Sequence, residues 1–124
     1  MKHILVVDDV AVNLQTVKFI LGDKYRVSAV TSGKMALDFL SRNITDFPDL
    51  ILMDIRMPNL SGLETVKKIR EKYDDATPPV IYLTAISDKK TVVDCFKEGL
   101  SDYVIKPFDP DNLIAKIETV LGDM

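Results

Sequence analysis

The chain of 124 residues has few of the residues that mark several large classes of protein. It has a single cysteine, Cys95, which excludes a disulfide framework and a cysteine cluster that binds metal. No run of about 18 apolar residues is present, so the sequence predicts no membrane span. The segment before the first apolar run, 1–3, is too short for a signal peptide. These absences favour a cytoplasmic protein.

The charge and the histidine content are also modest. The net charge of -3 gives no sign of a nucleic-acid or lipid partner. The one histidine, His3, stands at the start of an apolar run, where we expect a structural or surface role and no catalytic base. With 47% hydrophobic residues, the chain can build one sizeable core. We therefore predict a single domain over 1–124, with no room for a second domain after its last helix.

Strand-like and helix-like patterns alternate along the chain. β-branched and apolar residues predict strands over 3–7, 25–30, 49–53, 80–83 and 103–105. Each strand is followed by apolar residues at helical spacing. The expected start residues are Ser32, Ser61 with Glu64 as a capping box, Ser87, and Asp109 before Pro110; Gly22 and Gly99 end two helices. The residues expected to face inward are Leu14, Val17, Leu21, Ala36, Leu37, Leu40, Leu63, Val66, Ile69, Tyr73, Val92, Val93, Phe96, Leu113, Ile117, Val120 and Leu121.

This alternation predicts an α/β fold. Five parallel strands joined by right-handed crossovers form a doubly wound sheet with helices on both faces, which suits strands that are apolar on both sides. In such a sheet, binding sites form at the carboxyl ends of the strands where the strand order reverses. The order 2-1-3-4-5 puts that point between the first and third strands. The sequence does not fix this order, but the order explains the acidic residues most economically.

Three acidic residues come directly at the ends of those two strands. Asp8 and Asp9 follow the first strand, and Asp54 follows the third. Carboxylates held close together repel one another, and a hard divalent cation such as Mg²⁺ relieves the repulsion. Taken alone, Asp8 and Asp9 could instead form the N-terminal cap of a helix, since Asp9 precedes one, but Asp54 weakens that alternative. The acids therefore predict a magnesium site.

Two further polar residues end neighbouring strands. Thr84 follows the fourth strand and Lys106 follows the fifth. A hydroxyl and an ammonium beside a metal-bound carboxylate are typical of phosphoryl transfer, because they interact with the phosphoryl oxygens. Asp54 stands alone at a strand end, whereas Asp8 and Asp9 form a pair suited to the metal. We therefore predict that Asp54 is the acceptor, a carboxylate that forms a mixed anhydride.

With these residues in place, the chain resembles the receiver domain of the response regulators of two-component signal transduction, a chemotaxis-regulator-like family with a flavodoxin-like (βα)5 fold. The resemblance covers the whole chain. It rests on 7–9 (Val-Asp-Asp), 53–58 (Met-Asp-Ile-Arg-Met-Pro) with Gly62, 83–85 (Leu-Thr-Ala) and 102–108 (Asp-Tyr-Val-Ile-Lys-Pro-Phe). Together, in this order and at strand ends, these motifs are highly specific.

The resemblance implies a function and its binding residues. Asp54 would accept a phosphoryl group from the phosphohistidine of a sensor histidine kinase or a phosphotransfer protein. Asp9, Asp54 and the backbone carbonyl of Arg56 would bind Mg²⁺, with Asp8 acting through water. The chain would be a signalling switch and would catalyse only its own phosphorylation and dephosphorylation, with no direct role on nucleic acid or at a membrane.

The resemblance also implies how the switch operates. Thr84 and Lys106 would contact the phosphoryl group, Thr84 would move toward it, and Tyr103 would turn inward behind it. The surface of the fourth helix, fifth strand and fifth helix would then change, and this surface could support a homodimer. In this family the Lys106–Pro107 bond is typically cis. The kinase and the output domain or target remain unspecified.

Three other classes of protein share parts of this pattern. A phosphohydrolase of the haloacid dehalogenase type needs a second acid two residues after its nucleophile, where this chain has Arg56. A flavodoxin-like cofactor binder needs a glycine- or hydroxyl-rich loop after the first strand, where this chain has Val-Ala-Val-Asn at 10–13. A degenerate receiver that only docks would lack site residues that are all present here. The uptake of one stable phosphoryl group, as opposed to multiple turnover, separates the switch from the hydrolase.

Overall fold

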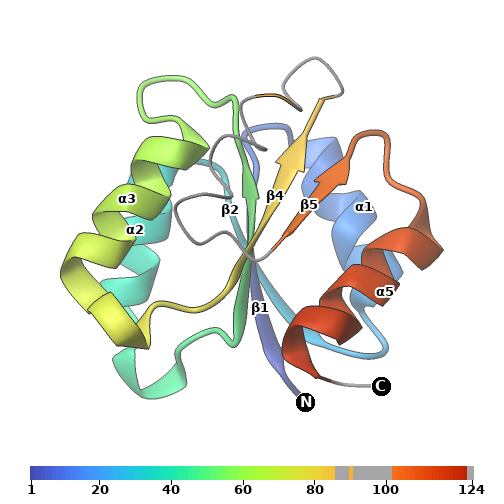
Figure 1. The fold of residues 1–124 in the computed structure, drawn as a ribbon, viewed down its shortest axis with the longest axis horizontal. Coiled ribbons are helices and arrows are strands. Elements are labelled where there is room, and N and C mark those ends of the chain that lie inside the picture. The colour runs from blue at the N-terminus through green and yellow to red at the C-terminus, as the bar shows by residue number, and fades with distance from the viewer. Residues whose placement is uncertain (86–89, 91–101, 123–124) are drawn as a thin grey trace.

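The computed structural model describes residues 1–85, 90 and 102–122, and these residues form an α/β sandwich around one parallel sheet. The five strands lie in the order β2-β1-β3-β4-β5, as predicted. Figure 1 shows α2 and α3 on one face of the sheet and α1 and α5 on the other. The strands are β1 (His3–Val7), β2 (Arg26–Val30), β3 (Leu50–Asp54), β4 (Val80–Thr84) and β5 (Asp102–Ile105). The helices are α1 (Ala11–Leu21), α2 (Gly33–Arg42), α3 (Gly62–Tyr73) and α5 (Pro110–Leu121), with 3₁₀ turns η1 (Ile44–Asp46) and η2 (Asp74–Ala76).

β1 matches its prediction, and each of the other four strands differs from its prediction by one residue at one or both ends. β3 extends through Asp54, because Asp54 still pairs with Leu83 of β4. β4 likewise extends through Thr84, which pairs with Ile105 of β5. Tyr25, predicted as strand, instead donates its N–H to the Leu21 carbonyl as the chain leaves α1. Pairing with neighbouring strands thus fixes the backbone of Asp54 and of Thr84.

The predicted helix caps are confirmed for three helices. The Ser61 hydroxyl accepts from the Glu64 N–H at 3.1 Å, and the Glu64 carboxylate accepts from the Ser61 N–H at 3.1 Å, which completes the capping box. The backbone N–H and the side chain of Ser61 stabilise the charged Glu64 carboxylate and lower the pKa of Glu64. Ser32 caps α2, and Asp109 caps α5 ahead of Pro110. The helix predicted to begin at Ser87 and end at Gly99, including Cys95, lies outside the described residues.

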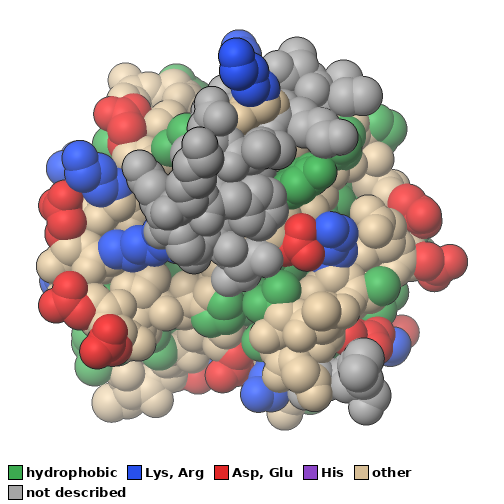
Figure 2. All heavy atoms as spheres, in the orientation of Figure 1, with side chains coloured by type: hydrophobic (Ala, Val, Ile, Leu, Met, Phe, Trp, Pro, Cys, Tyr) green, Lys and Arg blue, Asp and Glu red, His purple; other side chains and the backbone are tan. Residues whose placement is uncertain are grey.

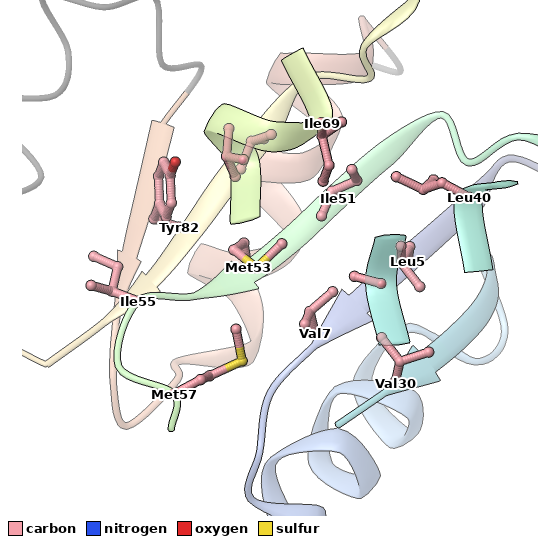
Figure 3. Close-up of a cluster of buried hydrophobic side chains, with 13 residues drawn as sticks. Leu5, Val7, Val30, Leu40, Ile51, Met53, Ile55, Met57, Ile69 and Tyr82 are labelled. Atoms are coloured by element: carbon pink, nitrogen blue, oxygen red, sulfur yellow. The ribbon is translucent and has the colours of Figure 1, made fainter. Parts of the chain in front are cut away.

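Two hydrophobic clusters occupy the two faces of the sheet. Because side chains alternate along a strand, Leu5 and Val7 join the cluster under α2 and α3, while Ile4 and Val6 join the cluster under α1 and α5. Figure 3 shows the first cluster, in which Met53 and Tyr82 lie between the sheet and α3. Burial of apolar side chains on both faces stabilises the sheet, and the loops of the site extend from the ends of its strands.

The surface carries charges of both signs. Figure 2 shows acidic and basic side chains interspersed over the described part of one face, with hydrophobic side chains in small groups between them. The exposed surface in view therefore has no large area of one charge.

Among the described helices, none is long and apolar enough to cross a membrane.

Candidate functional site

The three predicted acidic residues meet at the carboxyl edge of the sheet. Val7 pairs with Met53, so the residues that follow them, Asp8 and Asp54, lie side by side at the reversal point between β1 and β3. Each of Asp8, Asp9 and Asp54 offers a carboxylate oxygen, and these oxygens lie within 4.8 Å of one another. Asp8 is fully buried and Asp54 is 5% exposed, whereas Asp9 is exposed. The donors are all oxygen, which suits a hard divalent cation such as Mg²⁺.

Lys106 joins two of these acids. Its ammonium lies 3.0 Å from Oδ2 of Asp8 and 3.1 Å from Oδ1 of Asp54. The backbone holds it there, because the Lys106 N–H donates to the Thr84 carbonyl at 2.8 Å, at the end of the β4–β5 ladder. The Lys106–Pro107 peptide bond is cis, as expected. One lysine thus bridges the ends of β1 and β3 from the far side of β4.

The ionisation of Asp54 reflects this crowding. Burial raises the pKa of Asp54 to about 6, and the neighbouring Asp8 and Asp9 add to the rise, while Lys106 opposes it. Burial alone lowers the pKa of Lys106, but its contacts with Asp8 and Asp54 outweigh burial and raise that pKa above its ordinary value. Lys106 therefore stays charged, and it only partly offsets the effect of burial and of the neighbouring acids on Asp54.

Asp8 is more constrained than its neighbours. Its Oδ1 accepts the Val10 N–H at 3.0 Å, and its Oδ2 accepts the side-chain amide of Asn13 at 3.1 Å as well as Lys106. Val10 is the N-cap residue of α1 and makes no side-chain cap, so Asp9 does not serve as the cap of this helix. The capping alternative for Asp9 is therefore wrong, and the Asp9 carboxylate remains exposed at the site.

The other predicted site residues lie around this cluster. Thr84 is buried at the end of β4, and its hydroxyl donates to the Ala85 carbonyl at 3.0 Å. Arg56 is exposed two residues after Asp54. Tyr103 on β5 is half-buried, with the Lys116 ammonium 5.4 Å from its ring centroid. Lys116 also pairs with Asp102 at 2.8 Å, so this residue of α5 contacts two neighbouring residues of β5.

Gly62 is essential for the approach of α3 to the site. Its N–H donates to the Ile55 carbonyl at 2.8 Å, and a Cβ at this position would lie 2.0 Å from the backbone oxygen of Asp54. Any larger residue would push the start of α3 away from the end of β3. Glycine appeared in the sequence motif, but only the structure gives this reason for it.

Sequence reasoning missed Asn13 and assigned His3 correctly. Asn13 lies one helical turn after Asp9, a spacing that could have indicated a side chain facing back toward the acids. His3 is buried at the opposite end of β1, where its ring nitrogens contact Ser28 at 2.7 Å and the Asp46 carbonyl at 3.2 Å. His3 therefore has a structural role away from the site.

Comparisons of sequence agree with this geometry. A sequence model of the family described as the response regulator receiver domain matches residues 4–118. Response regulator SaeR of Staphylococcus aureus (strain USA300) is 35% identical over 127 aligned residues, which cover 100% of this chain and 52% of that protein. The chain thus spans about half the length of the curated relatives it matches.

Solved structures share the whole fold. The chemotaxis protein CheY4 of Vibrio cholerae superposes with a TM-score of 0.86 at 30% identity, covering 98% of this chain and 99% of that chain. A response regulator receiver domain protein from Clostridium thermocellum gives a TM-score of 0.88 at 29% identity, covering 98% of this chain and 95% of that one. Sequence and structure therefore agree on one group of relatives.

Proposed function

The chain belongs to the response regulator receiver domain family of two-component signalling, and from this premise we propose that Asp54 is the residue that accepts the phosphoryl group. Phosphoryl acceptance on an aspartate is a general property of this family. The observation that carries the assignment is that Lys106 bridges Asp8 and Asp54 at the point where β1 and β3 end. Asp8 has both oxygens engaged by hydrogen bonds, which leaves Asp54 as the buried acid suited to attack.

The proposed reaction is a transfer between two side chains. An oxygen of the Asp54 carboxylate forms a bond to phosphorus while the bond from phosphorus to the donor's histidine nitrogen breaks. The imidazole keeps the electron pair and takes up a proton from solvent. Lys106 then pairs with a phosphoryl oxygen instead of Asp54, and the chain catalyses no reaction beyond its own phosphorylation and dephosphorylation.

Asp9, Asp54 and the Arg56 carbonyl would hold a Mg²⁺ ion, with Asp8 acting through water. The mutual approach of the acidic oxygens to within 4.8 Å supports this assignment. When bound, the ion offsets negative charge on the phosphoryl oxygens. The residues themselves orient the acceptor, because β1 and β3 fix the acids and Lys106 separates the charges of Asp8 and Asp54.

The signal would leave the site through Thr84 and Tyr103. The phosphoryl group would carry about 1.5 to 2 negative charges where the carboxylate carries one, and this added charge would draw the Thr84 hydroxyl from the Ala85 carbonyl. Tyr103 would then turn inward and alter the surface of the fourth helix, β5 and α5. A homodimer through this surface is part of the proposal, although the predicted fourth helix lies outside the described residues.

The partners follow from this chemistry. A sensor histidine kinase or a histidine phosphotransfer protein would supply the phosphoryl group, and it must approach Val10 and Val12, which are 46% and 63% exposed beside the acids. We propose that residues 1–124 form one receiver domain acting in the cytoplasm, which suits a chain with one cysteine.

Acetyl phosphate with Mg²⁺ tests the assignment of the acceptor. We expect the intact mass of the full chain to rise by one phosphoryl group, and the gain to vanish in Asp54→Asn and in excess EDTA. Asp38→Asn is the matched control, because Asp38 lies exposed on α2 and pairs only with Arg42 among the described residues. Equal phosphorylation of Asp54→Asn would contradict the proposal, and multiple turnover of a phosphate ester would indicate a hydrolase.

A further inference from the structure

Asn13 contacts the acidic cluster from the first turn of α1. Its side-chain amide donates to Oδ2 of Asp8 at 3.1 Å, and Asn13 is itself half-buried. The contact spans two elements, because Asp8 follows β1 and Asn13 belongs to α1. The hydrogen bond therefore links the start of the helix to the acid at the centre of the site.

The surroundings of Asp8 show why this contact matters. Asp8 is 0% exposed, so its carboxylate depends on protein donors in place of water. Among the described residues it has three donors: the Val10 N–H, the Asn13 amide and the Lys106 ammonium. Two of them converge on the same oxygen, Oδ2, and only one of those two is charged.

A cation bound among the acids would affect these donors differently. Lys106 lies 3.0 Å from Asp8 and 3.1 Å from Asp54, so its positive charge repels any divalent ion that binds the same carboxylates. The Asn13 amide is neutral and approaches from the helix. It can keep its hydrogen bond to Asp8 whether Lys106 contacts the carboxylates or a phosphoryl group.

We propose that Asn13 is a positioning residue of the cation site, which holds the Asp8 carboxylate in its orientation when Lys106 is displaced. This inference rests on the proposed function, in which the acids bind Mg²⁺. Asn13 does not touch the ion or the phosphoryl group. It acts through Asp8, as hydrogen-bond partners behind metal-binding carboxylates do in other sites.

The test is the Mg²⁺ affinity of the full, unphosphorylated chain. Backbone amide NMR measures this affinity in a Mg²⁺ titration at constant ionic strength. Loss of such a partner typically weakens metal binding at least about tenfold, and we expect this loss in Asn13→Ala. The control is Thr16→Ala, one turn further along α1, whose hydroxyl bonds only the Val12 carbonyl among the described contacts. Thr16→Ala should bind Mg²⁺ like the wild type.

A double-mutant cycle distinguishes positioning from a general effect on the helix. In the Asp8→Asn background, Asn13→Ala should change the Mg²⁺ affinity less than about twofold, because the carboxylate it orients is gone. Unchanged affinity in Asn13→Ala, or the same loss in both backgrounds, would overturn the inference. If the wild type binds no Mg²⁺, the proposed function fails as well, so the two failures are distinguishable. Folded and unfolded chains give separate amide signals and only those of the folded form are followed, so a change in stability does not imitate the expected result.

Discussion

At the scale of single residues, the site is an arrangement of unequal carboxylates. Asp8 is fully buried and hydrogen-bonded through both oxygens, Asp9 is exposed, and Asp54 is buried against Lys106. Three aspartates of one site thus differ in burial and in hydrogen bonding because their surroundings differ. The raised pKa of Asp54, about 6, is the measurable sign of this difference.

The pKa of Asp54 predicts how stability depends on pH without metal. Between its ordinary value of 3.8 and about 6, the folded chain retains a proton that the unfolded chain has released. Stability from this group is therefore present at low pH and is lost as pH rises to about 6. Asp54→Asn lacks this loss and should gain stability relative to the wild type, by at most about 3 kcal/mol above pH 6.

Urea unfolding in EDTA at pH 4, 5, 6 and 7 measures this effect. The difference between Asp54→Asn and the wild type should be small near pH 4 and should grow to a plateau near pH 7. Asp38→Asn, exposed on α2, should show a difference that varies little over this range. A pH-independent gain in Asp54→Asn would contradict the assigned pKa.

At the scale of elements, close contacts between α3 and β3 hold the acceptor in place. In Gly62→Ala the new methyl would meet the Asp54 backbone oxygen at 2.0 Å and the Ile55 Cα at 3.0 Å. Backbone atoms cannot rotate away, so α3 must shift. We expect a loss of roughly 1–3 kcal/mol in unfolding free energy together with slower phosphorylation by acetyl phosphate.

Gly122→Ala separates these two effects of Gly62→Ala. Gly122 ends α5 with φ of 72°, and a Cβ there meets no atom within 4 Å. Alanine at 122 should therefore cost stability through left-handed backbone strain and leave the phosphorylation rate unchanged. If Gly62→Ala phosphorylates at the wild-type rate, the packing of α3 does not position Asp54.

The contact between α5 and β5 gives a second prediction at this scale. Lys116 pairs with Asp102 and lies over the Tyr103 ring, a contact worth about 0.5–1 kcal/mol when partly exposed. Lys116→Met keeps the apolar stem and removes the charge. We expect the Tyr103 ring signals of the unphosphorylated chain to move toward their positions in the phosphorylated chain, as followed by NMR with labelled tyrosine.

Lys72→Met is the matched control for this ring contact. Lys72 lies 5.4 Å from the Tyr73 ring, the same distance as Lys116 from Tyr103. Lys72→Met should shift the ring signals of Tyr73 and leave the ring signals of Tyr103 unchanged. Equal Tyr103 signals in Lys116→Met and the wild type would show that the lysine does not hold the ring.

The elements themselves were largely predictable from the sequence. Alternating periodicities gave the strands and helices, and Ser61 with Glu64 marked a helix start that the structure confirms. Strand ends were off by one residue, because pairing with the neighbouring strand extends β3 through Asp54. Local patterns do not contain that pairing.

Contacts between distant segments were harder to predict. Placement of Asp8, Asp54 and Lys106 at one edge followed from the strand order, but the bridge that Lys106 makes between the two acids did not. The Asn13 amide and the approach of Gly62 to Asp54 depend on how helices pack on the sheet. Tertiary packing sets the side-chain orientation at such contacts, and the hydrophobic periodicity of the sequence does not predict it.

At the scale of the whole molecule, the acids and the buried histidine lie at opposite ends of the sheet. The acids lie at the carboxyl ends of β1 and β3, whereas His3, whose ring contacts Ser28 and the Asp46 carbonyl, lies at the start of β1. Two buried clusters cover the two faces of the sheet between these ends.

The most direct test of the central claim is to locate the phosphoryl group on the chain. Borohydride reduction converts an aspartyl phosphate to homoserine, which peptide mass spectrometry assigns to a position. After treatment of the full chain with acetyl phosphate and Mg²⁺, we predict homoserine at position 54 alone, and none when EDTA replaces Mg²⁺. Homoserine at position 8 or 9, or labelling at 54 that does not depend on Mg²⁺, would contradict the account.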